Sequence, residues 1–126
     1  MEITVGMDTD RKGNNMTRKE IGDFGEQVAA GWLKKNGYGI IERNFRCKAG
    51  EIDIIACRGG TLVFTEVKTR TGDAFGWPAE AVDHSKQMHM RRAAEWYLHM
   101  HRIYDTPVRF DVVEVLLDHL KGVAEC

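Results

Sequence analysis

The spacing of apolar residues along the chain predicts two helices. Residues 17–20 (TRKE) have the spacing of a helix-capping box, and an apolar stripe with helical period follows them. Asn36 and Gly37 form a typical helix end, so the first helix is predicted over about 18–36. A second stripe, which begins after Pro78, predicts a helix over about 79–102.

Runs rich in β-branched and apolar residues predict four strands. They cover residues 39–45, 51–57, 61–69 and 108–117. Gly59 and Gly60, between the second and third runs, predict a tight hairpin turn. The resulting order α-β-β-β-α-β predicts an α/β fold with a mixed central sheet flanked by helices.

The chain is predicted to contain a single domain over residues 17–120. A length of 126 residues is sufficient for one compact domain with a sizeable core. Residues 1–16 are rich in Gly, Asn, Asp and Met, so we expect them to be a disordered N-terminal extension. Residues 121–126 are expected to form a C-terminal tail.

Charge and cysteine content restrict the class of protein. The net charge of −1 counts mildly against strong non-specific nucleic-acid binding, although lysines and arginines concentrate in the middle of the chain. The three cysteines show no C-x-x-C spacing and predict no disulfide framework. No apolar run is long enough to span a bilayer, so we expect a soluble cytoplasmic protein without a membrane partner.

The predicted hairpin brings charged residues together. A two-residue turn at 59–60 places Asp53 opposite Glu66 and Glu51 opposite Lys68, with all four side chains on one face of the sheet. The same face also carries apolar side chains, including Phe64. Directly opposed carboxylates repel each other unless a cation lies between them.

Two carboxylates at the border of an apolar face suit a hard divalent cation such as Mg²⁺ or Mn²⁺. Such an ion polarises a phosphoryl oxygen and lowers the pKa of a bound water. Lys68 lies two residues from Glu66 and can orient that water or stabilise transition-state charge. The pattern therefore predicts phosphodiester hydrolysis. The alternative is a solvated polar face in which Glu51 and Lys68 form a cross-strand ion pair.

Three further residues are candidates for the same site. Lys86 lies on the apolar stripe of its helix and needs an anionic partner, or else it extends to solvent at the helix start. Glu26 has small helix neighbours and is either a third carboxylate of the site or an ordinary exposed glutamate. Arg70, with Phe75 and Trp77 on the same loop, either contacts nucleic acid or belongs to a loop whose aromatic rings pack on the core.

The chain resembles the YraN-like family of small bacterial proteins. The motifs that carry the resemblance are Gly25-Glu26, Arg43-Asn44, GEIDIIA at 50–56, VFTEVKTR at 63–70, Ala81-Val82, Lys86 and AAEWYL at 93–98. That family is similar to the archaeal Holliday-junction resolvases and to the wider restriction-endonuclease-like, PD-(D/E)xK, superfamily. The resemblance covers about residues 20–115.

The resemblance implies a restriction-endonuclease-like fold and identifies a set of site residues. Asp53, Glu66 and Lys68 match the D…E-x-K site of the superfamily, and Glu26 matches the glutamate on the first helix of the resolvase-like branch. The carbonyl of Val67 is then a further metal ligand. Lys86 matches a polar helix position near the site. Two departures are Ile52, where many members have proline, and Thr65, where an apolar residue is commoner.

These observations predict an Mg²⁺- or Mn²⁺-dependent endonuclease that hydrolyses nucleic acid, with DNA at branched or repair-related structures as the favoured substrate. Asp53, Glu66, Val67 and Glu26 are the predicted metal ligands, and Lys68 is the catalytic cation. The sequence also predicts that Arg70 and Lys86 bind the phosphate. The resemblance to resolvases implies a homodimer. The alternative is a non-catalytic nucleic-acid- or protein-binding module that keeps the same fold.

Overall fold

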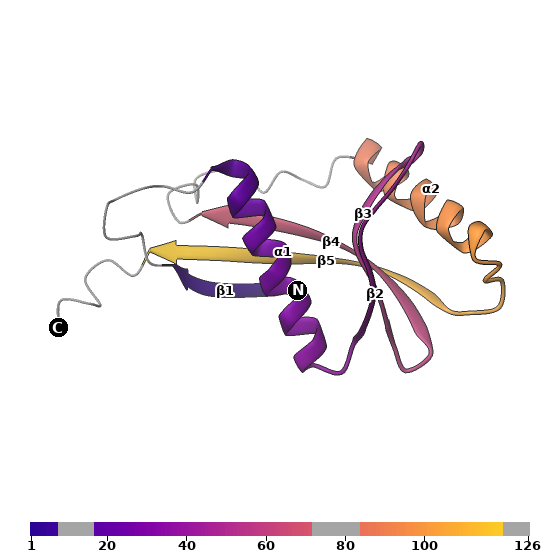
Figure 1. Ribbon diagram of the computed structural model, residues 1–126, viewed down its shortest axis with the longest axis horizontal. Coiled ribbons are helices and arrows are strands. Elements are labelled where there is room, and N and C mark those ends of the chain that lie inside the picture. Colours follow the sequence, from indigo (N-terminus) through magenta and orange to yellow (C-terminus); the bar gives the residue numbers. More distant parts are fainter. Residues whose placement is uncertain (8–16, 72–83, 120–126) are drawn as a thin grey trace.

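A computed structural model describes residues 1–7, 17–71 and 84–119 (Figure 1). In chain order, the elements are β1 (Glu2–Met7), α1 (Arg18–Lys35), β2 (Gly39–Cys47), β3 (Gly50–Arg58), β4 (Thr61–Thr71), α2 (His84–Met100) and β5 (Val108–His119). Apart from β1, this is the predicted order α-β-β-β-α-β.

The strands form one mixed sheet in the order β1-β5-β4-β3-β2. Strands β2, β3 and β4 pair antiparallel, whereas β5 pairs parallel to both β4 and β1. The sheet is strongly twisted, so β2 and β3 run steeply across the direction of β4, β5 and β1 (Figure 1). The predicted α/β fold with a mixed sheet and flanking helices is confirmed, and it is consistent with a restriction-endonuclease-like fold.

The first helix begins with the predicted capping box. Thr17 Oγ1 accepts a hydrogen bond from Glu20 N at 3.1 Å, and Glu20 Oε1 accepts one from Thr17 N at 3.1 Å. These bonds satisfy backbone donors that the first helical turn leaves without partners. The helix ends at Lys35 with Asn36 as its C-cap, one residue from the predicted end.

The β3–β4 hairpin has the predicted turn and register. Gly59 and Gly60 have φ values of 56° and 81°, which a two-residue type I′ turn requires and glycine adopts without strain. The paired residues run from Arg58 with Thr61 to Ile54 with Thr65. The register calculated from the turn is therefore correct for the paired part of the hairpin.

Two apolar clusters lie on opposite faces of the sheet. The α1 side buries Ala29, Leu33, Ile54, Val63, Val113 and Val115, among others. The α2 side buries Phe45, Ile52, Ile55, Phe64, Ala93 and Tyr97, among others. Because side chains alternate along a strand, neighbours such as Ile54 and Ile55 enter different clusters. The two helices thus cover the two faces, as the element order predicts.

The N-terminal residues correct one expectation. Residues 2–7 form β1, which pairs with residues 114–119 of β5, so the disordered extension predicted for 1–16 is wrong for this segment. The Met1 ammonium also donates to the Val112 carbonyl at 3.0 Å. Residues 8–16, the 79–83 part of the predicted second helix, and the predicted tail at 121–126 lie outside the described residues.

Candidate functional site

Asp53 lies where strands β3 and β4 separate. The hairpin was predicted to pair Asp53 with Glu66, but the paired part ends one residue earlier, at Ile54 and Thr65. Asp53 Oδ2 accepts a hydrogen bond from Val67 N at 2.8 Å. The carboxylate thus bonds to the backbone of β4 itself and holds the two separating strands together.

A residue of β2 with positive φ lies beside this separation. Asn44 has a φ of 55°, a left-handed conformation that asparagine adopts more readily than most residues. The alternation of side chains is interrupted at the same level, since Ile52 belongs to the α2-side cluster and Ile54 to the α1-side cluster. The prediction that strict alternation continues through Asp53 is therefore wrong. The irregular backbone frees Asp53 to reach toward β4.

Glu66 carries the second carboxylate, on the α2 side of β4. It is 6% exposed, one of two buried polar residues in the described part of the chain. Its Oε1 forms a 2.5 Å ion pair with Lys86 Nζ, from the first turn of α2. A buried carboxylate is costly without such a partner. The anionic partner predicted for Lys86 is confirmed, and 61% of the lysine side chain remains exposed to solvent.

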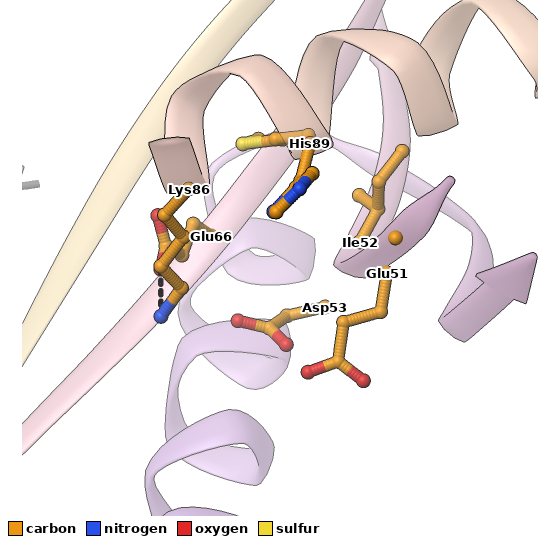
Figure 2. A pocket seen from close by; sticks show the side chains of 8 residues that line it. Glu51, Ile52, Asp53, Glu66, Lys86 and His89 are labelled. Atoms are coloured by element: carbon orange, nitrogen blue, oxygen red, sulfur yellow. Dashed lines mark ion pairs between the residues drawn. The ribbon is translucent and has the colours of Figure 1, made fainter. Parts of the chain in front are cut away.

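A cavity of about 170 Å³ opens between these groups (Figure 2). It is lined by Gly50, Glu51, Ile52, Asp53, Glu66, Lys86, His89 and Met90. Asp53 projects into the space between the Glu66–Lys86 pair and Glu51, and the ring of His89 faces the cavity from α2 (Figure 2). Strands β3 and β4 thus present three carboxylates to one cavity, and the start of α2 adds Lys86 and His89.

Glu26 approaches the same region from α1, on the other face of the sheet. Its preceding residue, Gly25, is buried against β4 so closely that a Cβ atom there would lie 1.8 Å from Thr69 Oγ1. This close approach needs glycine, and it holds Glu26 near the sheet. Glu26 accepts a hydrogen bond from Asn44 and interacts electrostatically with Asp53.

The electrostatics of the cavity disfavour charge on two carboxyls. Burial raises the pKa of Asp53 above its usual value, and repulsion from Glu66 and Glu51 raises it further, although the Val67 N–H and Lys86 oppose the change. Burial also raises the pKa of Glu26, with repulsion from Asp53 as the next cause. The short contact with Glu66 raises the pKa of Lys86. Burial, with repulsion from neighbouring carboxylates as a further cause, therefore disfavours the charged forms of Asp53 and Glu26.

The remaining predicted residues lie along β4. Lys68 is half-buried and shares the face of Glu66 by strand alternation, but it does not line the cavity. Arg70, two residues further, forms a 3.3 Å ion pair with Glu114 of β5. Val67 contributes its N–H to Asp53. Phe75 and Trp77, which were expected either to contact nucleic acid with Arg70 or to pack on the core, lie outside the described residues.

Two polar residues of the cavity, Glu51 and His89, were not among the predicted site residues. Glu51 was predicted to face Lys68, whereas its Oε2 forms a 3.2 Å ion pair with Arg46 of β2. No role was predicted for His89 from the sequence. Its position one helical turn after Lys86 is the signal that places it over the same cavity.

The donor groups agree with a magnesium site of few protein ligands. Within residues 1–7, 17–71 and 84–119, no group of three or more His, Cys, Asp or Glu side chains is arranged to hold a metal ion. Mg²⁺ commonly binds through one or two carboxylates and completes its coordination with waters and substrate phosphates. Asp53 and Glu66 provide such a pair, and the repulsion that Glu66 exerts on Asp53 is the kind that a cation relieves. The residues present therefore fit the ion.

Comparison with known proteins identifies the family. The family model described as "Uncharacterised protein family UPF0102" matches residues 25–115. The chain belongs to the UPF0102 family. The predicted resemblance to a YraN-like bacterial family is thereby confirmed. The matched UPF0102 segment includes Glu26, Asp53, Glu66, Lys68 and Lys86.

Several UPF0102 proteins are close relatives. One from Caldicellulosiruptor saccharolyticus is 50% identical over 103 residues, which are 82% of this chain and 87% of the relative. One from Moorella thermoacetica is 48% identical over 109 residues, 86% and 91% of the two chains. One from Alkaliphilus oremlandii is 52% identical over 101 residues, 79% and 86%. In the described part of this UPF0102 chain, neither helix has the length and apolarity needed to cross a membrane.

Proposed function

We propose that this protein is a metal-dependent endonuclease that hydrolyses phosphodiester bonds of nucleic acid, with branched or repair-related DNA as its substrate class. The observation that carries the proposal is the convergence of Asp53 and Glu66 on one cavity, with the ammonium of Lys86 beside them. Carboxylates that repel each other in a partly dry site favour a divalent cation. Such arrangements occur at functional sites more often than chance predicts.

In this proposal, Asp53 and Glu66 would hold Mg²⁺ or Mn²⁺, and the Val67 carbonyl would be a further ligand. When bound, the ion would supply a Lewis acid for the phosphate and a more acidic water. Glu26 lies close enough to Asp53 to interact with it electrostatically, so it assists through an intervening water or directly. Lys68, on the Glu66 face of β4, orients the attacking water and stabilises negative charge on the phosphate.

Lys86 has two successive partners in this scheme. Its ammonium neutralises Glu66 in the metal-free protein. With a divalent ion bound at Glu66, the Lys86 side chain, which is 61% exposed, would be available to contact a substrate phosphate. Arg70 lies on the same strand as Glu66 and Lys68, and its guanidinium forms an ion pair with Glu114. It contributes a further positive charge that attracts the phosphate backbone of the nucleic acid.

A non-catalytic binding module is the second candidate. The Glu66–Lys86 ion pair favours it, because a lysine already neutralises the carboxylate that the enzyme would use for its metal. In a module of this kind, the site would be a structural ion pair and the surface would bind nucleic acid or protein. The two candidates differ in whether the protein responds to a divalent cation.

The decisive experiment is an incubation with a substrate panel in the presence of Mn²⁺, Mg²⁺ or EDTA. The panel contains single-stranded, duplex, bulged, flap and four-way-junction DNA, with matched RNA strands. Wild-type protein should cleave at least one substrate only when the metal is present. Asp53→Asn and Lys68→Ala should each lower the rate by a factor of about a hundred or more, within the range of single catalytic groups.

Lys34→Ala provides the matched control, because Lys34 is an exposed lysine at the far end of α1. This variant should cleave at the wild-type rate after the same purification. Cleavage that survives in both Asp53→Asn and Lys68→Ala would come from a contaminant. The enzyme proposal would also fail if the pure protein cleaved no substrate of the panel in Mn²⁺ or Mg²⁺.

A further inference from the structure

A second cavity of about 170 Å³ lies beside the first, and Glu66 lines both. Its walls come from β4, α2 and β5. They consist of Glu66, Gln87, Met90, Arg91, Phe110, Asp111 and Val112. Because Glu66 separates the two cavities, any group in the second one lies next to the proposed metal and phosphate position.

The cavity exists because α2 does not cover the whole sheet. The helix packs mainly on β3 and β2, so its edge leaves part of the neighbouring surface of β5 open. Phe110 of β5 lies there and is 42% exposed. Its ring stacks on Phe64 with centroids 5.6 Å apart and an interplanar angle of 27°. The aromatic ring is therefore held in a fixed orientation by the core and is also accessible.

A cation lies over the same ring. The guanidinium carbon of Arg91 is 5.8 Å from the Phe110 centroid, near the outer limit of a cation–π contact. Arg91 is exposed, so its guanidinium can shift to cover a flat group that enters above the ring. Gln87 adds an amide that both donates and accepts hydrogen bonds. The Asp111 carboxylate is bound by Arg109 at 2.9 Å, which reduces its repulsion of an anionic ligand.

A nucleobase matches these groups. Bases stack on aromatic side chains and arginine planes, and their edges exchange hydrogen bonds with amides. Two exposed cations of α2, Arg91 in this cavity and Lys86 in the neighbouring one, favour an attached phosphate backbone. A paired base inside a duplex cannot reach such a pocket, whereas an unpaired or flipped base can.

We propose that the cavity between α2 and β5 binds one unpaired nucleobase next to the phosphate that is cleaved. This inference rests on the proposed nuclease function and specifies its substrate class. Phe110 forms the stacking platform, Arg91 covers the base, and Gln87 contacts its edge. The protein would then recognise nucleic acid at a bulge, a frayed end or a strand junction, and fully paired duplex would bind more weakly.

Binding without turnover tests the proposal directly. Three fluorescein-labelled probes share one sequence: a blunt duplex, the duplex with a single unpaired adenine, and the same bulge with an abasic residue. Fluorescence anisotropy in EDTA should show that the wild-type protein binds the adenine bulge about fivefold to a hundredfold more tightly than the other two. Phe110→Leu keeps an apolar side chain against Phe64, and it should remove this preference while leaving the duplex Kd unchanged.

Trp96→Leu is the matched control, because Trp96 is an aromatic residue of α2 that is 47% exposed and does not line the cavity. It should keep the preference for the bulge. If Phe110→Leu fails to fold, Arg91→Gln at an exposed position provides the same test and should reduce the preference. Equal binding of all three probes by the wild-type protein would overturn the inference.

Equal loss of the preference in Trp96→Leu and Phe110→Leu would also overturn it. Neither result affects the nuclease proposal, which the metal-dependent cleavage assay tests separately. A wild-type protein that binds none of the probes and cleaves none of the panel would overturn both.

Discussion

The Lys86 ammonium lies 2.5 Å from Glu66 Oε1, and this ion pair joins the first turn of α2 to the middle of β4. The pair spans 20 positions of sequence, and it neutralises one of the two carboxylates that the proposed metal needs. The lysine and a divalent cation therefore compete for the same oxygen. This competition has a measurable consequence.

Lys86→Met should bind Mn²⁺ about threefold to tenfold more tightly than the wild-type protein, because no ammonium then opposes the ion. The same change should lower the free energy of unfolding of the metal-free protein by about 1 kcal/mol, since Glu66 loses its partner. This loss of unfolding free energy is small because 61% of the lysine side chain is exposed to solvent. Isothermal titration calorimetry and urea unfolding measure the two effects, with Lys35→Met as control. Weaker Mn²⁺ binding in Lys86→Met would contradict the prediction.

Asp53→Asn should stabilise the metal-free protein at neutral pH. The pKa of Asp53 is raised in the folded state by burial and by repulsion from Glu66, so ionisation costs stability as the pH rises from the ordinary aspartate pKa through the raised one. That cost remains at pH 7, and an asparagine oxygen can still accept from Val67 N. We expect a gain of about 1 kcal/mol in urea unfolding.

The gain should shrink as the pH falls and Asp53 of the wild-type protein takes up its proton. Added Mn²⁺ should then stabilise the wild-type protein and leave Asp53→Asn unchanged. Glu95→Gln, at an exposed position of α2, is a control for the general effect of removing one negative charge. A destabilised Asp53→Asn at pH 7 would show that the carboxylate is a net stabilising group and not a strained functional one.

Gly25→Ala should destabilise the protein by about 1–3 kcal/mol, because the new Cβ would lie 1.8 Å from Thr69 Oγ1 and 2.8 Å from Thr69 Cβ. The helix must move away from β4, and Glu26 moves with it, so Mn²⁺ affinity should fall as well. Gly22→Ala is the matched control in the same helix, since its Cβ meets no atom within 4 Å. That variant should gain about 0.5–1 kcal/mol. Similar melting temperatures for the two variants would refute the close packing.

Affinity for Mn²⁺ should decrease as the pH falls, and the decrease should begin at a higher pH than for exposed carboxylates. Metal and proton compete for Asp53 and Glu26, and burial raises the pKa of both. Calorimetric titration between pH 8 and 5 measures this dependence. Glu26→Gln should make the dependence shallower, because one of the competing groups no longer titrates. An affinity that is constant over this range argues against carboxylate ligands.

Local sequence signals were sufficient to predict most of the fold. The Gly59-Gly60 turn fixed the hairpin register, and the capping box fixed the start of α1, because both depend on neighbouring residues alone. The strand at residues 2–7 was missed. Its partners are in β5, more than 100 positions away, and a short EITVGM segment has no local turn or long apolar run to indicate pairing.

For the candidate site, the sequence indicated which charged residues lie close together but not their detailed geometry. The turn placed Asp53 near Glu66, and the position of Lys86 on the apolar stripe indicated either an anionic partner or an extension to solvent. The structure shows Glu66 as the partner, with 61% of the lysine side chain exposed. The details depended on backbone irregularity, which alternation alone does not predict. The left-handed Asn44 interrupts the regular pattern at the level of Asp53, and the carboxylate bonds to the Val67 N–H. An asparagine inside a predicted strand was the available signal for this left-handed residue.

The parallel strand β1 has a practical meaning for shortened forms of the protein. The Glu114 N–H donates to the Met1 carbonyl at 2.7 Å, and the pairing continues along β5 to His119. A form that starts at Met16 would leave this row of amide and carbonyl groups open along an apolar strand, the kind of edge at which chains add to one another. Self-association of such a truncated form would therefore result from the loss of β1 from the edge of the sheet. It would say nothing about how the intact molecule assembles.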